Sequence, residues 1–345
     1  MKKIYLSLLL YATLLTGCLD QISYETENYQ YKLIVDGSVS NAPGPYRLKL
    51  FTSKQYTDPD NTEPFSADKV TLTEVGGKSI NYAQKDGGVY ETDSASFRCE
   101  IGKSYYIKIV TIDGKIYQSR PETILQPVPI DTYKIDFSKD VLNPRPFNLS
   151  IVTKDPIIKS NLYQWKWAHY DSTTACVKAK TWRGVVVNLC CNKEKCWNYA
   201  PCLDCIYTGS DALTNGKTII TPVGAFPYDS RKPYFIVLQQ FSISPQYFQF
   251  LKIANTQIYN SGGIFDNPPA KVPGNITNIN DLTEDVLGYF SASGLTQKAV
   301  FIERDRKEYP RLTPPPKCDW NLVLPECRTC DGPLRTNRQP FGWKE

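Results

Sequence analysis

The chain has 345 residues, a formal net charge of +5 and hydrophobic side chains at 41% of its positions. Its basic residues are scattered rather than clustered, which argues against a nucleic-acid-binding protein. The length favours two domains, and the content of 23 tyrosines, 25 prolines and 20 glycines favours strands and turns over long helices.

The N-terminus has the order of a secretory signal. Lys2 and Lys3 precede an apolar run that leads into Leu15-Thr16-Gly17-Cys18. A cysteine directly after small residues is typical of a bacterial lipoprotein signal, in which residues 1–17 are removed and Cys18 is acylated. The alternatives are an ordinary secretory signal and a transmembrane helix, but the apolar run is shorter than the roughly 20 residues that span a bilayer.

Acylation at Cys18 predicts a lipid anchor. A lipoprotein cysteine carries chains on both its sulfur and its amine, and more than one chain makes membrane attachment stable. Residues 18–30 are polar and form a lipidated tether whose last twelve residues span about 40 Å when fully extended.

Residues 31–122 are expected to form a first β-sandwich. Strands are predicted where polar and apolar residues alternate or β-branched residues follow one another, and turns where glycine pairs or Asp-Gly pairs occur. The first strand is expected to end at Asp36-Gly37, and three prolines between Pro121 and Pro129 mark the domain boundary. The other strands are predicted at Tyr46–Leu50, Val70–Val75, Gly88–Tyr90, Tyr105–Ile112 and Ile116–Tyr117.

Residues 128–305 are expected to form a second β-sandwich with one helix. Ser244 is a predicted N-cap with proline after it, and apolar residues at helical spacing extend the helix over 245–260. Strands are predicted at Tyr234–Leu238 and, as a closing hairpin, at Val286–Ser291 and Ala299–Glu303. The fold class is therefore all-β, with two immunoglobulin-like sandwiches, a disulfide-rich insertion at 174–207 and a Pro- and Cys-rich tail at 306–345.

The cysteines predict disulfides. Outside the cytoplasm a high cysteine density indicates cross-links, and an insertion with little apolar periodicity would need them. Connectivity does not follow from spacing, and Cys99 stands apart in the first half. The nine candidates are Cys176, Cys190, Cys191, Cys196, Cys202, Cys205, Cys318, Cys327 and Cys330.

Zinc is the competing interpretation, because Cys202 and Cys205, like Cys327 and Cys330, have ligand spacing. More than a hundred residues separate the two pairs and no histidine lies near them, so disulfides are favoured. A thioredoxin-like redox site is disfavoured because neither pair lies in a βαβ pattern.

Several segments resemble a known family. They are Leu33–Gly37, Gly88–Tyr90, Gly102–Tyr117, Ser242–Ser244, Phe265–Pro269, Gly274–Ile276 and Val286–Ser293. Together with the signal they are similar to the Bacteroidota lipoprotein family catalogued only as domain of unknown function 4249. The resemblance implies an outer-membrane lipoprotein, exposed at the cell surface and accessory to a TonB-dependent transporter. It carries no catalytic residue.

Enzyme motifs are absent from the sequence. No nucleophile elbow, phosphate loop or dinucleotide fingerprint occurs, and His169 is the sole histidine. It shares a predicted strand face with Tyr163, Trp165 and Trp167, which favours a core position. Pairs of acids for glycoside hydrolysis remain open, since 35 acidic residues offer many combinations. We expect neither an enzyme nor a cofactor.

Binding is the better expectation. The favoured hypothesis is a non-catalytic interaction subunit of an outer-membrane assembly. The alternative is a glycan- or peptide-binding lipoprotein that uses Trp182 and Trp197 of the insertion, although these rings could also pack against the disulfides. The loop with Asp58, Asp60, Asn61 and Glu63 could hold calcium, but it lacks the EF-hand glycine and a solvated loop is favoured.

Overall fold

The computed structural model describes a predominantly β-stranded protein. Its described residues are 30–54, 58, 62–93, 97–138, 145–157, 161–180, 183–184, 186–202, 206–212, 214–227, 234–259, 272–304, 330, 334–337 and 339–343. Sixteen of the described strands belong to one continuous sheet, and three more form a separate small sheet. No helix in these ranges is long and apolar enough to cross a membrane. The lipoprotein signal and Cys18 lie outside the described residues.

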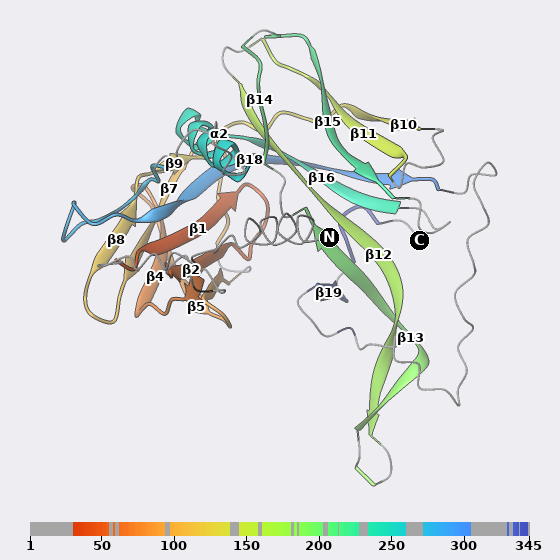
Figure 1. Cartoon of the computed structure of the whole chain (residues 1–345), viewed down its shortest axis with the longest axis horizontal. Helices are drawn as coiled ribbons and strands as arrows, with labels where there is room; N and C mark the ends of the chain where they lie inside the picture. Colours follow the sequence, from red (N-terminus) through yellow and green to blue (C-terminus); the bar gives the residue numbers. More distant parts are fainter. Residues whose placement is uncertain are drawn as a thin grey trace, which may run out of the picture.

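The first hydrophobic core lies between two layers of short antiparallel strands at one end of the molecule (Figure 1). Inward-facing residues alternate with exposed ones along each strand, as in β7, where Tyr105, Ile107 and Ile109 are completely buried. The strands are β1 (Leu33–Ser40), β2 (Arg47–Ser53), β3 (Thr62–Pro64), β4 (Lys69–Glu74), β5 (Ser79–Gln84), β6 (Val89–Thr92), β7 (Ser104–Val110), β8 (Ile116–Ser119), β9 (Glu122–Thr123) and β17 (Ile276–Asn278).

The second core lies between the small sheet β10-β11-β15 and the strands β18, β16 and β12. Tyr163 and Trp165 of β12 are buried in it, as the shared strand face predicted, with Trp167 packed beside them. The strands are β10 (Thr132–Phe137), β11 (Phe147–Lys154), β12 (Leu162–Lys180), β13 (Val186–Pro201), β14 (Tyr207–Ser210), β15 (Thr218–Phe226), β16 (Tyr234–Ser242), β18 (Leu287–Ile302) and β19 (Arg335–Thr336).

β18 joins the two cores, and here the predicted closing hairpin is wrong. Residues 287–302 form one continuous strand, whose first half pairs with β1 and whose second half pairs with β16. Gly294 looks like a turn in sequence, but a Cβ built there would lie 2.2 Å from the Leu125 carbonyl oxygen. The glycine therefore allows the linker between the cores, at Leu125 and Pro127, to cross β18 closely.

Residues of β17 and β18, which come late in the chain, belong to the first core. Ile276, Phe290 and Ala292 pack in the first core, although they lie within residues 128–305. The first core thus combines residues between 33 and 124 with residues between 276 and 292.

The predicted end of the first strand at Asp36-Gly37 is also wrong. β1 continues to Ser40, and Gly37 is a strand residue without a positive φ. A Cβ built there would lie 2.3 Å from Leu48 Cδ1 and 3.3 Å from Phe290 Cδ2. Glycine is required by close packing rather than by a turn.

The predicted helix is confirmed as α2 (Pro245–Tyr259). The Ser244 hydroxyl accepts a hydrogen bond from the Tyr247 backbone N–H at 3.2 Å, which caps the first turn as predicted. α2 lies against β18, where Tyr247 and Phe250 pack their rings on Tyr289 at centroid distances of 5.0 and 4.9 Å. This helix therefore covers the face of β18 opposite to the first core.

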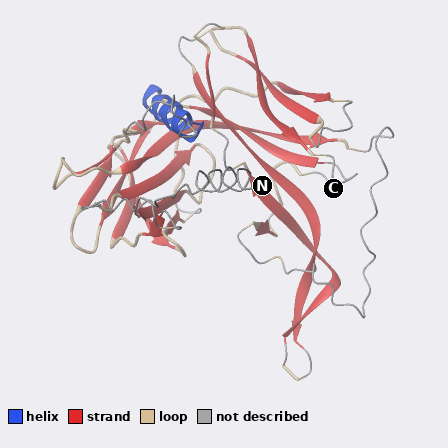
Figure 2. Ribbon diagram, viewed as in Figure 1, coloured by secondary structure: helices blue, strands red, loops and turns tan. Residues whose placement is uncertain are grey.

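The predicted insertion at 174–207 belongs largely to a long hairpin. β12 and β13 pair from Ala168 opposite Pro201 to Lys180 opposite Val186. Figure 2 shows the two strands leaving the body of the molecule together as an arm. The sequence lacked apolar periodicity here because the outer part of the arm lies beyond the second core.

Candidate functional site

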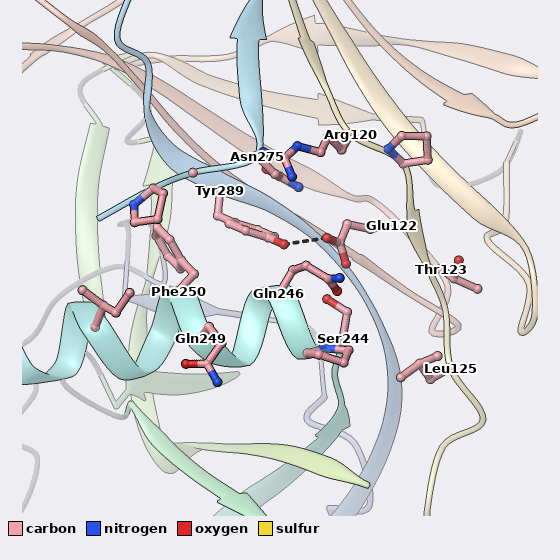
Figure 3. A pocket seen from close by; sticks show the side chains of 15 residues that line it. Arg120, Glu122, Thr123, Leu125, Ser244, Gln246, Gln249, Phe250, Asn275 and Tyr289 are labelled. Atoms are coloured by element: carbon pink, nitrogen blue, oxygen red, sulfur yellow. Dashed lines mark hydrogen bonds between the residues drawn. The ribbon is translucent and has the colours of Figure 1, made fainter. Parts of the chain in front are cut away.

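A pocket of about 650 Å³ opens where the linker between the cores, the start of α2 and β18 meet (Figure 3). The linker contributes Arg120 and Glu122, and α2 contributes Gln246 and Phe250. The strands in its walls are β9 and β18, so the pocket lies beside the first core, with the start of α2 as its other wall.

Glu122 is the buried acid of this pocket, with 6% of its surface exposed. The Tyr289 hydroxyl donates a hydrogen bond to its Oε1 at 2.6 Å, which Figure 3 shows as a dashed line. Burial raises the pKa of Glu122 above the usual value, and hydrogen bonds with Tyr289, Ser244 and Asn275 partly offset this effect. The pKa of the Tyr289 hydroxyl is also raised, first by burial and then by the carboxylate.

Asn275 connects this acid to β18. Its side chain exchanges two hydrogen bonds with the backbone of Phe290, at 2.8 and 2.9 Å. The Arg120 backbone N–H donates to the Asn275 carbonyl oxygen at 2.8 Å. The linker, the segment before β17 and β18 therefore form one buried polar network, which reaches the start of α2 through the hydrogen bond between Glu122 and Ser244.

This network was not predicted from the sequence. Two segments of the family resemblance, Gly274–Ile276 and Val286–Ser293, meet here, since a Cβ at Gly274 would lie 2.1 Å from the Gly288 carbonyl oxygen. The available signals were the predicted N-cap at Ser244 and a lone acid, Glu122, within the proline-rich linker. Neither signal indicated that the side chains of Ser244 and Glu122 would contact each other.

Trp197, a predicted ligand contact, is buried instead, with 5% of its surface exposed. Its ring packs edge-on against Trp343 of the tail at a centroid distance of 5.9 Å. Trp343 also contacts Phe235 at 4.9 Å. Trp197 therefore offers no ring face for a sugar, and this part of the glycan- or peptide-binding hypothesis loses its support.

A disulfide between Cys196 and Cys330 covers the same region and links residues 134 positions apart. β19 pairs with β13 beside it, at Trp197 and Asn198. Cys202 is also disulfide-bonded, and Cys99 is a buried free thiol in the first core. Since the sulfurs of Cys202 and Cys330 are oxidised, they cannot be thiolate ligands of zinc in this state.

Several predicted site residues lie outside the described residues. They are Cys18, Cys205, Cys318, Cys327 and Trp182. For Cys176, Cys190 and Cys191 the structure describes the backbone in β12 and β13 but not the side chains.

His169 has a structural role. Its ring stacks on Tyr234 at a centroid distance of 3.5 Å, and its Nδ1 lies 2.9 Å from the Phe235 carbonyl oxygen. The candidate calcium loop is only partly described: Asp58 forms an ion pair with Lys54 at 3.5 Å, and Glu63 lies in β3. In the described ranges, no three His, Cys, Asp or Glu side chains are placed to hold a metal ion.

Comparison with known proteins places the chain in a family. No curated protein matches it. The family model described as Domain of unknown function (DUF4249) matches residues 20–299, which is most of the chain, and the chain therefore belongs to this family.

Proposed function

We propose that the protein is a lipid-anchored, non-catalytic interaction subunit at the outer membrane, accessory to a TonB-dependent transporter or a comparable assembly. The signal ending at Cys18 supports the anchor, and the polar residues that follow would hold the folded part near the membrane surface. Partner contact at the cell surface is then favoured by proximity.

We further propose that the two cores are two immunoglobulin-like β-sandwiches. Each hydrophobic cluster lies between two strand layers, which supports this division. The second sandwich carries the helix and the cross-linked hairpin, and β18 is shared between the two.

The observation that carries the proposed interaction is the β12–β13 arm (Figure 1). Within the described residues, the strand pairs from Asp171 opposite Asn198 to Lys180 opposite Val186 have no further neighbouring strand except β19 at Trp197 and Asn198. An isolated two-stranded ribbon is only marginally stable in water. A partner protein that covers the ribbon or extends its ladder would stabilise it.

The test is co-purification from gently solubilised outer membranes with a tag after Glu345. In the arm-shortened variant, Asn-Gly replaces residues 176–193 and joins Ala175 to Glu194, which are directly paired. This variant keeps Cys196 and Trp197. We expect the wild type to co-purify one outer-membrane protein in constant ratio, and the arm-shortened variant to lose it while it remains membrane-bound.

The matched control shortens only the tip. Asn-Gly replaces residues 181–185 and joins the paired Lys180 and Val186, so the ladder is kept. We expect this control to retain the partner. A wild-type protein that purifies alone, or an arm-shortened variant that keeps the partner, would contradict the proposal.

A further inference from the structure

A second pocket, of about 420 Å³, lies beside the first turn of α2. Its walls come from adjacent strands, β1, β18, β16 and β12, on the face opposite to the two cores. The register places Ser38 opposite Ser291 and Lys166 opposite Gln239, so polar side chains from four strands meet there. Tyr247 of α2 closes one side.

Lys166 and Arg47 are the charged residues that line this pocket. Lys166 stands between Trp165 and Trp167, whose rings pack in the second core, so its own side chain faces the other way. Its ammonium lies 5.6 Å from the centroid of the Phe241 ring. Among the described residues the structure gives Lys166 no hydrogen bond and no ion pair, and burial lowers the pKa of its ammonium.

The neighbouring charges are already paired. Arg47 forms an ion pair with Glu91 at 2.6 Å, and Lys49 pairs with Asp36 at 4.0 Å. Lys166 therefore leaves the pocket with one surplus positive charge. A half-buried ammonium without a counter-ion is unfavourable, and a ligand with one negative charge would relieve this cost.

The rest of the lining is mostly neutral and polar. Hydroxyl groups come from Ser38, Ser40 and Ser293, and Gln239 supplies an amide. The Tyr247 hydroxyl is held by hydrogen bonds with Ser291 and Gln164. Hydroxyls and amides both donate and accept, which suits the hydroxyl or amide groups of a small polar compound.

We propose that this pocket binds a small organic acid that carries one carboxylate and several hydroxyl or amide groups, with the carboxylate against Lys166. The single surplus charge favours a monoanion over a phosphate dianion. This ligand site is independent of the proposed partner contact, because it lies over α2 and β18 rather than on the outer arm.

The test measures binding of D-glucuronate and N-acetylglycine to the full-length protein in detergent by titration calorimetry. D-Glucose and inorganic phosphate are the neutral and dianionic comparisons. We expect saturable binding of at least one of the two monoanions, and at least about a tenfold weakening in Lys166→Met, the range expected for a lost charge-assisted hydrogen bond. Lys134→Met, which removes an exposed lysine of β10 outside the lining, should leave the affinity unchanged.

A second measurement does not need a variant. In the wild type, the bound monoanion should slow acylation of Lys166 by an amine reagent, followed by mass spectrometry, and should not slow that of Lys134. The proposal is overturned if neither monoanion binds, if glucose or phosphate binds more tightly, or if Lys166→Met binds as well as the wild type.

Discussion

The first core is built mainly from strands that are neighbours in the chain, whereas the second depends on distant segments. In the first, β1 pairs with β2, β4 with β5, β5 with β6 and β7 with β8. In the second, β12 pairs with β16 and β16 pairs with β18. A disulfide then joins β13 to the tail.

Buried polar groups connect distant segments of the second core. The Gln240 Oε1 atom accepts hydrogen bonds from Thr153 and Trp165, both at 2.8 Å, and its Nε2 atom donates to the Val128 carbonyl oxygen at 2.9 Å. Asp155 accepts from the Tyr163 hydroxyl at 2.5 Å. The first core also has buried side-chain hydrogen bonds, such as the one that the Cys99 backbone N–H donates to the Tyr46 hydroxyl at 2.8 Å. The difference among the described residues is therefore the cross-link, which fixes the second region to a segment far along the chain.

Removing the disulfide should have the largest effect on the stability of the second core relative to the first. Replacing both Cys196 and Cys330 by serine opens a link across 134 positions, and the chain-entropy model assigns about 4–5 kcal/mol to a loop of that length. We expect the second core to lose that much stability. Hydrogen exchange followed by mass spectrometry should show faster exchange in β13 and β16 than in β4 and β7.

Cys99→Ala is the control for this prediction. It removes a buried sulfur from the first core without opening a cross-link. Exchange should then change in the first core only. Equal acceleration of both cores in the double serine variant would show that the cross-link does not act locally.

Phe290→Ala tests whether β18 couples the cores. Phe290 is fully buried in the first core, and truncation of a buried phenylalanine costs about 3–5 kcal/mol. All six tryptophans lie at or after Trp165, so tryptophan fluorescence reports on the other core and its surroundings. We expect the fluorescence-detected unfolding midpoint to fall in Phe290→Ala, because the two cores share the strand β18.

An unchanged tryptophan midpoint in Phe290→Ala would mean that the cores unfold independently. Hydrogen exchange in β4 and β7 of the first core then provides the check that the substitution had its local effect.

The strands and the helix that were predicted correctly are those whose residue pattern reflects a single local feature, such as one buried face or one helix cap. Strand alternation in β2, β4 and β7 reflects one buried face, and α2 has its own N-cap at Ser244. β18 was missed because its two halves face different cores, so the alternation changes midway and Gly294 resembles a turn. Local patterns carry no information on such a shared strand.

The candidate sites were less predictable than the fold. Glu122, Asn275 and Tyr289 come from three separate segments, and only the tertiary structure brings them together. Lys166 lies between Trp165 and Trp167, so its side chain is predicted to point to the opposite face of the strand. The sequence does not predict that the nearby Arg47 and Lys49 are already paired with acids. Trp197 was predicted to lie in an exposed insertion. Its ring partner, Trp343, is far away in the sequence, so the local pattern around Trp197 could not reveal the contact.

The smallest expected effect concerns Glu122, at the junction of the cores. Burial raises the pKa of its carboxyl group above the usual value of 4.5, so the folded protein keeps this proton at a pH where the unfolded chain has lost it. The stabilising contribution of Glu122 is therefore complete below about pH 4.5 and is lost as the pH rises through the folded-state pKa. Glutamine is neutral at every pH and can still accept the Tyr289 hydrogen bond. Thermal unfolding should thus show Glu122→Gln gaining stability relative to the wild type as the pH rises.

Glu122→Ala separates charge from hydrogen bonding at the same position. It leaves the buried Tyr289 hydroxyl without its acceptor, which should cost about 1–3 kcal/mol on both sides of the titration. Because the Arg120–Asn275–Phe290 contacts remain, the loss should be confined to the junction, and hydrogen exchange should rise in β9 and at the start of α2 first. If Glu122→Gln and the wild type instead show parallel stability at every pH, Glu122 does not titrate with a raised pKa, and the junction is held by geometry alone.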